Sequence, residues 1–132
     1  MLLVDTSIWI ELLAGRIRGI GPTELAVFST CGPVVQEVLQ GLRPGPESDE
    51  FRRSILSLPC VCDPIPSSVF IHAAAIYREG RQRGYTIRSS TDCLIAAIAI
   101  EADTAIWHRD RGYRIVGKFT SLVQFPTSPF SR

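Results

Sequence analysis

The sequence predicts an α/β fold in which helices flank both faces of a mostly parallel central sheet of short strands. Short apolar runs alternate along the chain with longer segments whose apolar residues recur at helical spacing. The first apolar run, residues 2–4 (LLV), leads directly into such a segment, as in a βα unit. With 132 residues, the chain can bury one sizeable core but is too short for two ordinary ones. We therefore expect residues 1–132 to form one domain.

The N-terminal part contains two strand–helix units. Residues 2–4 are expected to form a buried strand, and residues 6–15 (TSIWIELLAG) a helix ended by its glycine. Residues 25–30 (LAVFST) predict a second strand. Pro33 can begin the helix VVQEVLQGL, which closes at Gly41.

The remaining elements follow the same alternation. The predicted helices are 47–58, 67–84 and 89–102, and the predicted short strands are 59–64 (PCVCDP), 103–108 (DTAIWH) and 122–125 (LVQF). The 67–84 segment carries an apolar stripe and a basic C-terminal end, which suits the helix dipole. The 89–102 segment is apolar all round, so this helix should be buried.

Composition narrows the setting of the protein. No apolar stretch approaches the ~20 residues that cross a bilayer, so we expect a cytoplasmic protein with no membrane partner. The four cysteines are scattered, and one residue, not the two to four of a zinc motif, separates Cys60 from Cys62. Buried reduced thiols are the expected outcome. The net charge of +1 says little about partners.

Four carboxylates can meet at one edge of the predicted sheet. Asp5 ends the first strand, Asp92 lies at the start of a helix, Asp110 follows a strand, and Glu37 lies about one turn into the second helix. Ligands of open parallel sheets bind beyond the C-terminal ends of the strands. Each residue also has a structural alternative, as a helix cap, a partner of the helix dipole or a solvated side chain.

Taken together, the four carboxylates indicate a bound cation. Carboxylates held close together raise one another's pKa unless a positive charge lies between them. An all-oxygen ligand set suits Mg²⁺ or Mn²⁺ better than Zn²⁺. Mg²⁺ bound by few carboxylates retains water molecules, and such a water can be deprotonated and directed at phosphorus.

The chain resembles the PIN-domain ribonucleases and, among them, the VapC-type toxins of type II toxin-antitoxin systems. Four stretches in the family's order carry the resemblance, which spans essentially the whole chain: MLLVDTSIWIELL, PVVQEVLQGL, IRSSTDCLIAAIAI and WHRDRGY. The resemblance implies a PIN fold. It also implies an endoribonuclease that leaves a 5′-phosphate and a 3′-hydroxyl, an RNA substrate, a cognate antitoxin and a homodimer.

The resemblance also assigns residues. It implies that Asp5, Glu37, Asp92 and Asp110 form the catalytic acidic quartet that binds Mg²⁺ or Mn²⁺. The hydroxyl of Thr6 or Ser7 matches a polar position that can orient a metal-bound water or Asp5, although a helix cap is an equal alternative for Thr6. We further expect Arg88, Arg109 and Arg111 to neutralise RNA phosphates without reading sequence. The apolar helices near residues 51–58 and 66–77 could form an interface or simply pack in the core.

One motif departs from the family. These toxins often have Asp-Arg-Asp-Tyr at the fourth motif, whereas this chain has Gly112 at the second acidic position. If that acid supports a second metal position, activity could be low. A PIN-like scaffold that binds RNA or a protein partner without cleavage is therefore the alternative.

Two other α/β classes fit poorly. Haloacid-dehalogenase-like phosphatases need a second aspartate two residues after the first, where this chain has Ser7. A phospho-acceptor receiver domain needs a lysine after its fourth strand, but the only lysine, Lys118, lies beyond the Asp110 motif.

Overall fold

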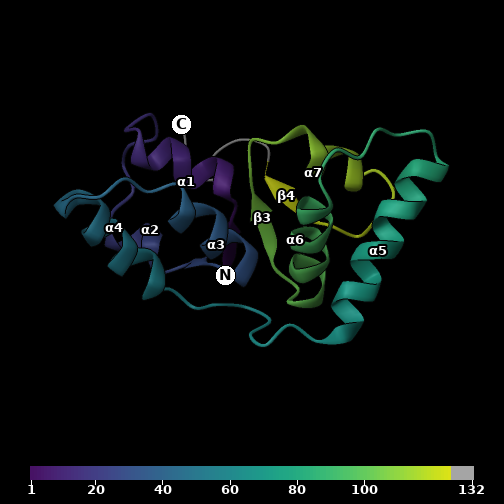
Figure 1. Ribbon diagram of the computed structural model, residues 1–132, viewed down its shortest axis with the longest axis horizontal. Helices are drawn as coiled ribbons and strands as arrows, with labels where there is room; N and C mark the ends of the chain where they lie inside the picture. Colours follow the sequence, from purple (N-terminus) through teal and green to yellow (C-terminus); the bar gives the residue numbers. More distant parts are fainter. Residues whose placement is uncertain (126–132) are drawn as a thin grey trace.

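The computed structural model describes residues 1–125 as alternating strands and helices (Figure 1). In chain order the elements are β1 (Leu2–Val4), α1 (Thr6–Leu13), α2 (Pro22–Leu25), β2 (Phe28–Ser29), α3 (Gly32–Gln40), α4 (Pro46–Leu56), α5 (Ser67–Gln82), α6 (Ser90–Glu101), β3 (Ala105–Trp107), α7 (Arg111–Val116) and β4 (Gln124–Phe125). No helix in this part of the chain is both long and apolar enough to cross a membrane.

The four strands form one parallel sheet in the order β2-β1-β3-β4. All three residues of the central strand β1 are buried, as are Ile106 and Trp107 of β3. Successive side chains of a strand point to opposite faces, so burial of consecutive residues means that both faces of the sheet are covered. The predicted α/β class with a mostly parallel sheet between helices is confirmed.

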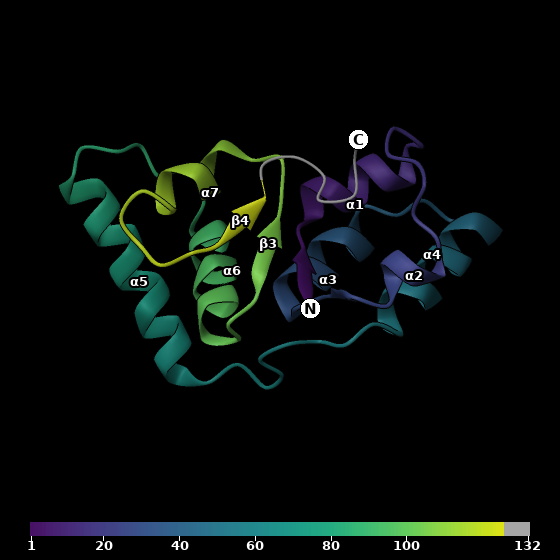
Figure 2. The same cartoon turned by 180° about the vertical axis from the view of Figure 1, so that it is seen from behind.

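The helices lie on both sides of the sheet. Figures 1 and 2 show α1 to α4 on one side of the molecule and α5 to α7 on the other, with β3 and β4 between them. Helix α6 lies between β3 and α5 and contacts both of them. The run from Ile95 to Ala99 in α6 is buried throughout, as predicted from its uniformly apolar sequence.

Two predicted strands differ from the structure. Residues 25–30 contain only the two-residue strand β2, because Pro22 starts the short helix α2 and the Glu24 carboxylate accepts a hydrogen bond from the Gly21 N–H at 2.8 Å. The 59–64 segment forms only a single parallel bridge between Cys60 and Thr30. Prolines at both of its ends keep the pairing from extending.

The apolar stripe of α5 packs in the core. Val69, Ala73 and Ile76 are buried, and α6 is the main contact of this helix. In α4, Ile55 is buried in the same core. Core packing accounts for these buried residues, whereas Leu56, Phe70 and Ile71 of the same two helices are exposed, so the interface alternative for these helices stays a prediction.

Candidate active site

The β1–β3 pairing determines where two of the carboxylates lie. The register places Val4 opposite Trp107, so the segments that follow these residues leave the sheet side by side. The Asp5 N–H donates to the Trp107 carbonyl at 3.0 Å and extends the pairing by one step. The indole N–H of Trp9 donates to the Val4 carbonyl at 3.0 Å and ties the first helix to the strand end. Asp5 and the 108–110 segment consequently share the C-terminal edge of the sheet.

Asp5 is buried and bound by hydrogen bonds at both oxygens. It caps α1, and its Oδ2 accepts from the N–H of Ser7 at 3.0 Å and from the Ser7 hydroxyl at 2.6 Å. Its Oδ1 accepts from the Tyr113 hydroxyl at 2.7 Å. Ser7 also accepts from the Arg109 N–H at 3.1 Å, which joins α1 to the segment after β3. Asp5 is thus both a helix cap and a rigidly oriented carboxylate.

Glu37 is oriented from the neighbouring helix. The Thr6 hydroxyl donates to Glu37 Oε1 at 2.8 Å, across the contact between α1 and α3. The two polar residues predicted beside Asp5 therefore have different contacts: Thr6 reaches Glu37, and Ser7 reaches Asp5.

Asp110 caps α7 and depends on a buried histidine. Its Oδ1 accepts from the Gly112 N–H at 2.8 Å, and its own N–H donates to His108 Nδ1 at 3.0 Å. Because Nδ1 accepts, the neutral imidazole carries its proton on Nε2, which donates to Gln124 Oε1 at 2.8 Å. Burial lowers the pKa of His108, which favours this neutral form.

The pKa of Asp92 is raised by its surroundings. It lies in the first turn of α6, where its N–H donates to the capping Ser89 hydroxyl at 3.1 Å. Burial raises its pKa to about 7, and the charges of Asp110, Asp5 and Glu37 add to the increase. The structure therefore brings the other three predicted carboxylates within electrostatic range of Asp92.

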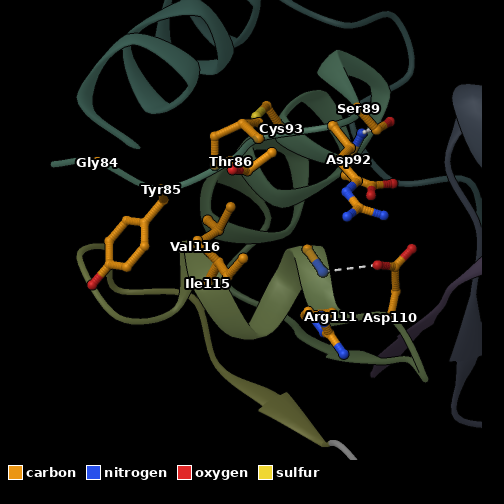
Figure 3. Close-up of a pocket in the computed structure, with 13 residues that line it drawn as sticks. Gly84, Tyr85, Thr86, Ser89, Asp92, Cys93, Asp110, Arg111, Ile115 and Val116 are labelled. Carbon is orange, nitrogen blue, oxygen red and sulfur yellow. Dashed lines mark hydrogen bonds between the residues drawn. The ribbon is translucent and has the colours of Figure 1, made fainter. Parts of the chain in front are cut away.

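A pocket of about 520 Å³ opens beside this cluster (Figure 3). Asp92 and Asp110 line it together with Arg88 and Arg111. Asp5 and Glu37 lie outside its lining.

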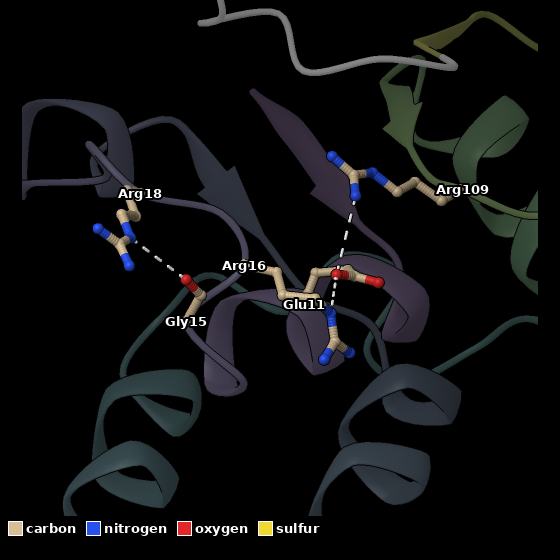
Figure 4. Close-up of polar contacts among 5 residues, drawn as sticks. All are labelled: Glu11, Gly15, Arg16, Arg18 and Arg109. Carbon is tan, nitrogen blue, oxygen red and sulfur yellow. Dashed lines mark hydrogen bonds and ion pairs between the residues drawn. The ribbon is translucent and has the colours of Figure 1, made fainter.

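Arg109 points elsewhere. Its guanidinium lies 3.8 Å from Glu11, which also pairs with Arg16 (Figure 4). Of the three arginines predicted to contact phosphate, two thus share a pocket with site carboxylates, and the third pairs with Glu11.

The ligand chemistry of the cluster can be tested against a metal. Within residues 1–125, no three Asp, Glu, His or Cys side chains are arranged to hold one ion as they stand. Among these same residues, no ion pair involves any of the four carboxylates. The four side chains are carboxylates, so they offer only oxygen atoms as ligands. Because no ion pair neutralises them, a divalent cation would supply the counter-charge. The four carboxylates fit such an ion by chemistry and electrostatics, with Asp92 and Asp110 facing the pocket.

Sequence reasoning gave no role to Tyr113 or His108. Tyr113 is fully buried, and burial and the neighbouring carboxylates raise its pKa well above the usual value, so its hydroxyl stays a neutral donor to Asp5. Its position three residues after Asp110, one helical turn on, is the signal that could have placed it at the site. His108 follows β3, in the segment that leads from the strand to Asp110.

Comparison with known proteins shows the family of this chain. The PIN domain family model matches residues 2–118. Ribonuclease VapC11 of Mycobacterium tuberculosis and VapC ribonuclease Mb1587 of Mycobacterium bovis are each 36% identical over 131 residues, which cover 92% of this chain and 96% of the relative. The chain belongs to the PIN domain family.

Solved structures share the fold. VapBC2 from Rickettsia felis, bound to a DNA fragment from its promoter, superposes with a TM-score of 0.66 at 14% identity, covering 94% of this chain and 96% of the other. VapBC-1 from nontypeable Haemophilus influenzae gives a TM-score of 0.65 at 14% identity, with the same coverage. These identities are too low to show more than the fold.

Proposed function

We propose that this protein is an endoribonuclease that hydrolyses RNA phosphodiester bonds with Mg²⁺ or Mn²⁺, and that it is the toxin of a toxin-antitoxin pair. The observation that carries the proposal is the uncompensated acidic cluster, in which three carboxylates help to raise the pKa of a fourth to about 7. The names of the 36% identical relatives, which are VapC ribonucleases, support RNA as the substrate.

We assign metal binding to Asp5, Asp92 and Asp110, and we assign to Glu37, with Asp110, the orientation and deprotonation of the attacking water. A bound divalent cation would polarise the phosphodiester and lower the pKa of a water molecule. The protein contributes fixed geometry, because Tyr113 and Ser7 orient Asp5, and Thr6 orients Glu37. Arg88 and Arg111 are positioned to neutralise backbone phosphates in the pocket.

The partners follow from the same proposal. The similar folds include toxin-antitoxin complexes of the VapBC type, so we propose a cognate antitoxin for this chain. The family resemblance adds a homodimer to the proposal. Cytoplasmic action fits the cysteines of residues 1–125, which are free thiols. Co-purification of a small protein encoded beside this gene tests the antitoxin.

Cleavage should require both the metal and the acidic cluster. Purified protein free of antitoxin, incubated with total bacterial RNA and Mg²⁺ or Mn²⁺, is expected to give fragments that disappear with EDTA. Asp5→Asn and Asp92→Asn are each expected to lower the cleavage rate at least ~100-fold, a loss of the size that mutation of a single catalytic group produces. Asp49→Asn, a change at an exposed carboxylate of α4, is the matched control and should cleave normally. Identical RNA profiles in all samples would leave the non-cleaving scaffold as the better description.

Gly112 lies against the cluster, so its replacement should disturb metal use. A Cβ atom there would lie 3.0 Å from Asp92 Oδ2 and 3.3 Å from Asp110 Oδ1. We expect Gly112→Ala to raise the Mn²⁺ concentration needed for half-maximal cleavage several-fold. The free energy of unfolding should change by less than about 1 kcal/mol, because alanine suits a helix and the half-buried Asp92 can shift.

Gly32→Ala is the control for this change. Gly32 also lies in the first turn of a helix, but a Cβ atom there would meet nothing within 4 Å. An unchanged metal requirement in Gly112→Ala would contradict the expected crowding of Asp92 and Asp110.

A further inference from the structure

Tyr85 lies at the opposite end of the pocket from the carboxylates. It belongs to the segment between α5 and α6, and its ring is half-buried. The pocket that contains Asp92 and Asp110 is also lined by Tyr85, and Figure 3 shows the ring at one end and the two carboxylates at the other. Nothing in the cleavage chemistry proposed above uses this aromatic end.

The Tyr85 ring is held by a second ring. It stacks on Phe119 with centroids 6.0 Å apart and an angle of 12° between the planes. Phe119 is fixed in turn by close packing on α5, where a Cβ atom on Gly80 would lie 3.2 Å from Phe119 Cζ. The aromatic surface beside the pocket is therefore preorganised and does not have to be ordered when a ligand binds.

Cations surround the ring pair. The Lys118 ammonium lies 5.5 Å from the centroid of Tyr85, and the Arg83 guanidinium lies 5.5 Å from that of Phe119. Both cationic side chains are exposed. An exposed ammonium over a ring contributes less than a stacked nucleobase does, and the flexible lysine stem can give way and keep its charge close by.

We infer that Tyr85 is a stacking platform for one nucleobase of a single-stranded RNA substrate, with Lys118 and Arg88 at the flanking phosphates. The inference rests on the proposed ribonuclease function and adds a residue that positions the substrate. Single-stranded RNA is recognised by bases stacked on aromatic side chains and by basic groups along the backbone. The pocket combines both features with the acidic cluster, so a strand bound along it would have its phosphates beside Asp92 and Asp110.

Binding without metal separates this role from catalysis. In EDTA, the affinity of a fluorescein-labelled single-stranded RNA oligonucleotide is measured by anisotropy. We expect Tyr85→Leu, which keeps apolar contact with Phe119 but removes the aromatic face, to raise Kd roughly 5- to 30-fold. Tyr85→Trp should retain the wild-type affinity. Tyr77→Leu is the matched control, because Tyr77 also has a cation over its ring, the Arg81 guanidinium, but does not line this pocket.

Abasic substitutions identify the stacked base. Removing that base from the oligonucleotide should weaken wild-type binding by the same factor and leave Tyr85→Leu unaffected, because both changes remove one interaction. If Tyr85→Leu binds as tightly as the wild type, or loses equal affinity for every abasic oligonucleotide, the ring is only structural and the inference fails. If the wild type neither binds nor cleaves RNA, both the stacking inference and the proposed function fail. Cleavage by the wild type with an unaffected Tyr85→Leu variant overturns the stacking role alone.

Discussion

In the absence of metal, the Asp92→Asn variant is expected to be more stable than the wild type at pH 8, by about 1–2 kcal/mol. Burial and the charges of three other carboxylates destabilise ionised Asp92. They raise its pKa to about 7 in the folded protein from the ordinary 3.8. The full shift corresponds to roughly 4 kcal/mol, which solvent reduces because the side chain is only half-buried. Asparagine removes the charge and leaves the Ser89 cap, which binds the backbone N–H, in place.

The pH dependence has a defined sign. A raised folded-state pKa means that the folded protein binds the proton more tightly than the unfolded chain, so this contribution to stability is complete below about pH 4 and is lost as pH rises through about 7. Urea unfolding of both proteins in EDTA from pH 4 to pH 8 should therefore show a difference that grows across this range. A variant that is less stable than the wild type at pH 8 would contradict the assignment.

Metal should reverse the order. A cation that binds only the folded wild type stabilises it by about 2.7 kcal/mol at a concentration 100 times its Kd. The Asp92→Asn variant loses one of the proposed ligands, so Mn²⁺ should stabilise it much less. Asp49→Asn, with its exposed side chain, should follow the wild type in both conditions.

The elements that the sequence predicted well are those whose burial is uniform. The apolar run at residues 2–4 is typical of a strand covered on both faces, and the apolar 89–102 segment is typical of a buried helix, and in the structure residues 2–4 and 95–99 are buried. The errors occur where local chemistry competes with the apolar pattern. The Pro22 start of α2 shortened the strand predicted over 25–30, and the 59–64 segment pairs through one residue.

The candidate site divides in a similar way. Strand ends and helix starts are visible in a sequence, so the four carboxylates could be placed at one edge of the sheet, and their catalytic roles stay a prediction. Tyr113 and His108 support Asp5 and Asp110 through contacts that depend on how α7 and β4 pack. The spacing of Tyr113 from Asp110 indicates that it lies near the site, but it does not specify which carboxylate its hydroxyl contacts. The direction of Arg109 toward Glu11 likewise depends on the tertiary contact between α1 and the segment after β3.

Asp5 and Asp92 should affect stability in opposite directions, although both belong to one cluster. Three hydrogen-bond donors, two from Ser7 and one from Tyr113, satisfy the carboxylate oxygens of Asp5. Asp92 gains no comparable set of donors and is repelled by its neighbours. The first carboxylate is therefore part of the scaffold as well as of the proposed metal site, whereas the second destabilises the metal-free fold.

Asp5→Ala is accordingly expected to destabilise the protein by about 2–4 kcal/mol, the largest loss predicted for a single site residue. The loss of the α1 cap costs about 1 kcal/mol. The Tyr113 hydroxyl, fully buried, loses its acceptor, which costs a further ~1–3 kcal/mol. Urea unfolding in EDTA measures the sum.

Two variants separate these contributions. Adding Tyr113→Phe to Asp5→Ala should not lower the free energy of unfolding further, because the second change removes the hydroxyl that the first leaves unpaired. A strongly additive loss of stability would contradict the Asp5–Tyr113 hydrogen bond. Asp5→Asn keeps an oxygen for the two Ser7 donors, and its amide can donate to the Tyr113 oxygen, so it should remain within about 1 kcal/mol of the wild type. Asp5→Asn is nevertheless expected to lose cleavage activity. If Asp5→Asn is folded but inactive and Asp5→Ala is destabilised, the charge of Asp5 is needed for the reaction and its hydrogen bonds are needed for the stability of the fold.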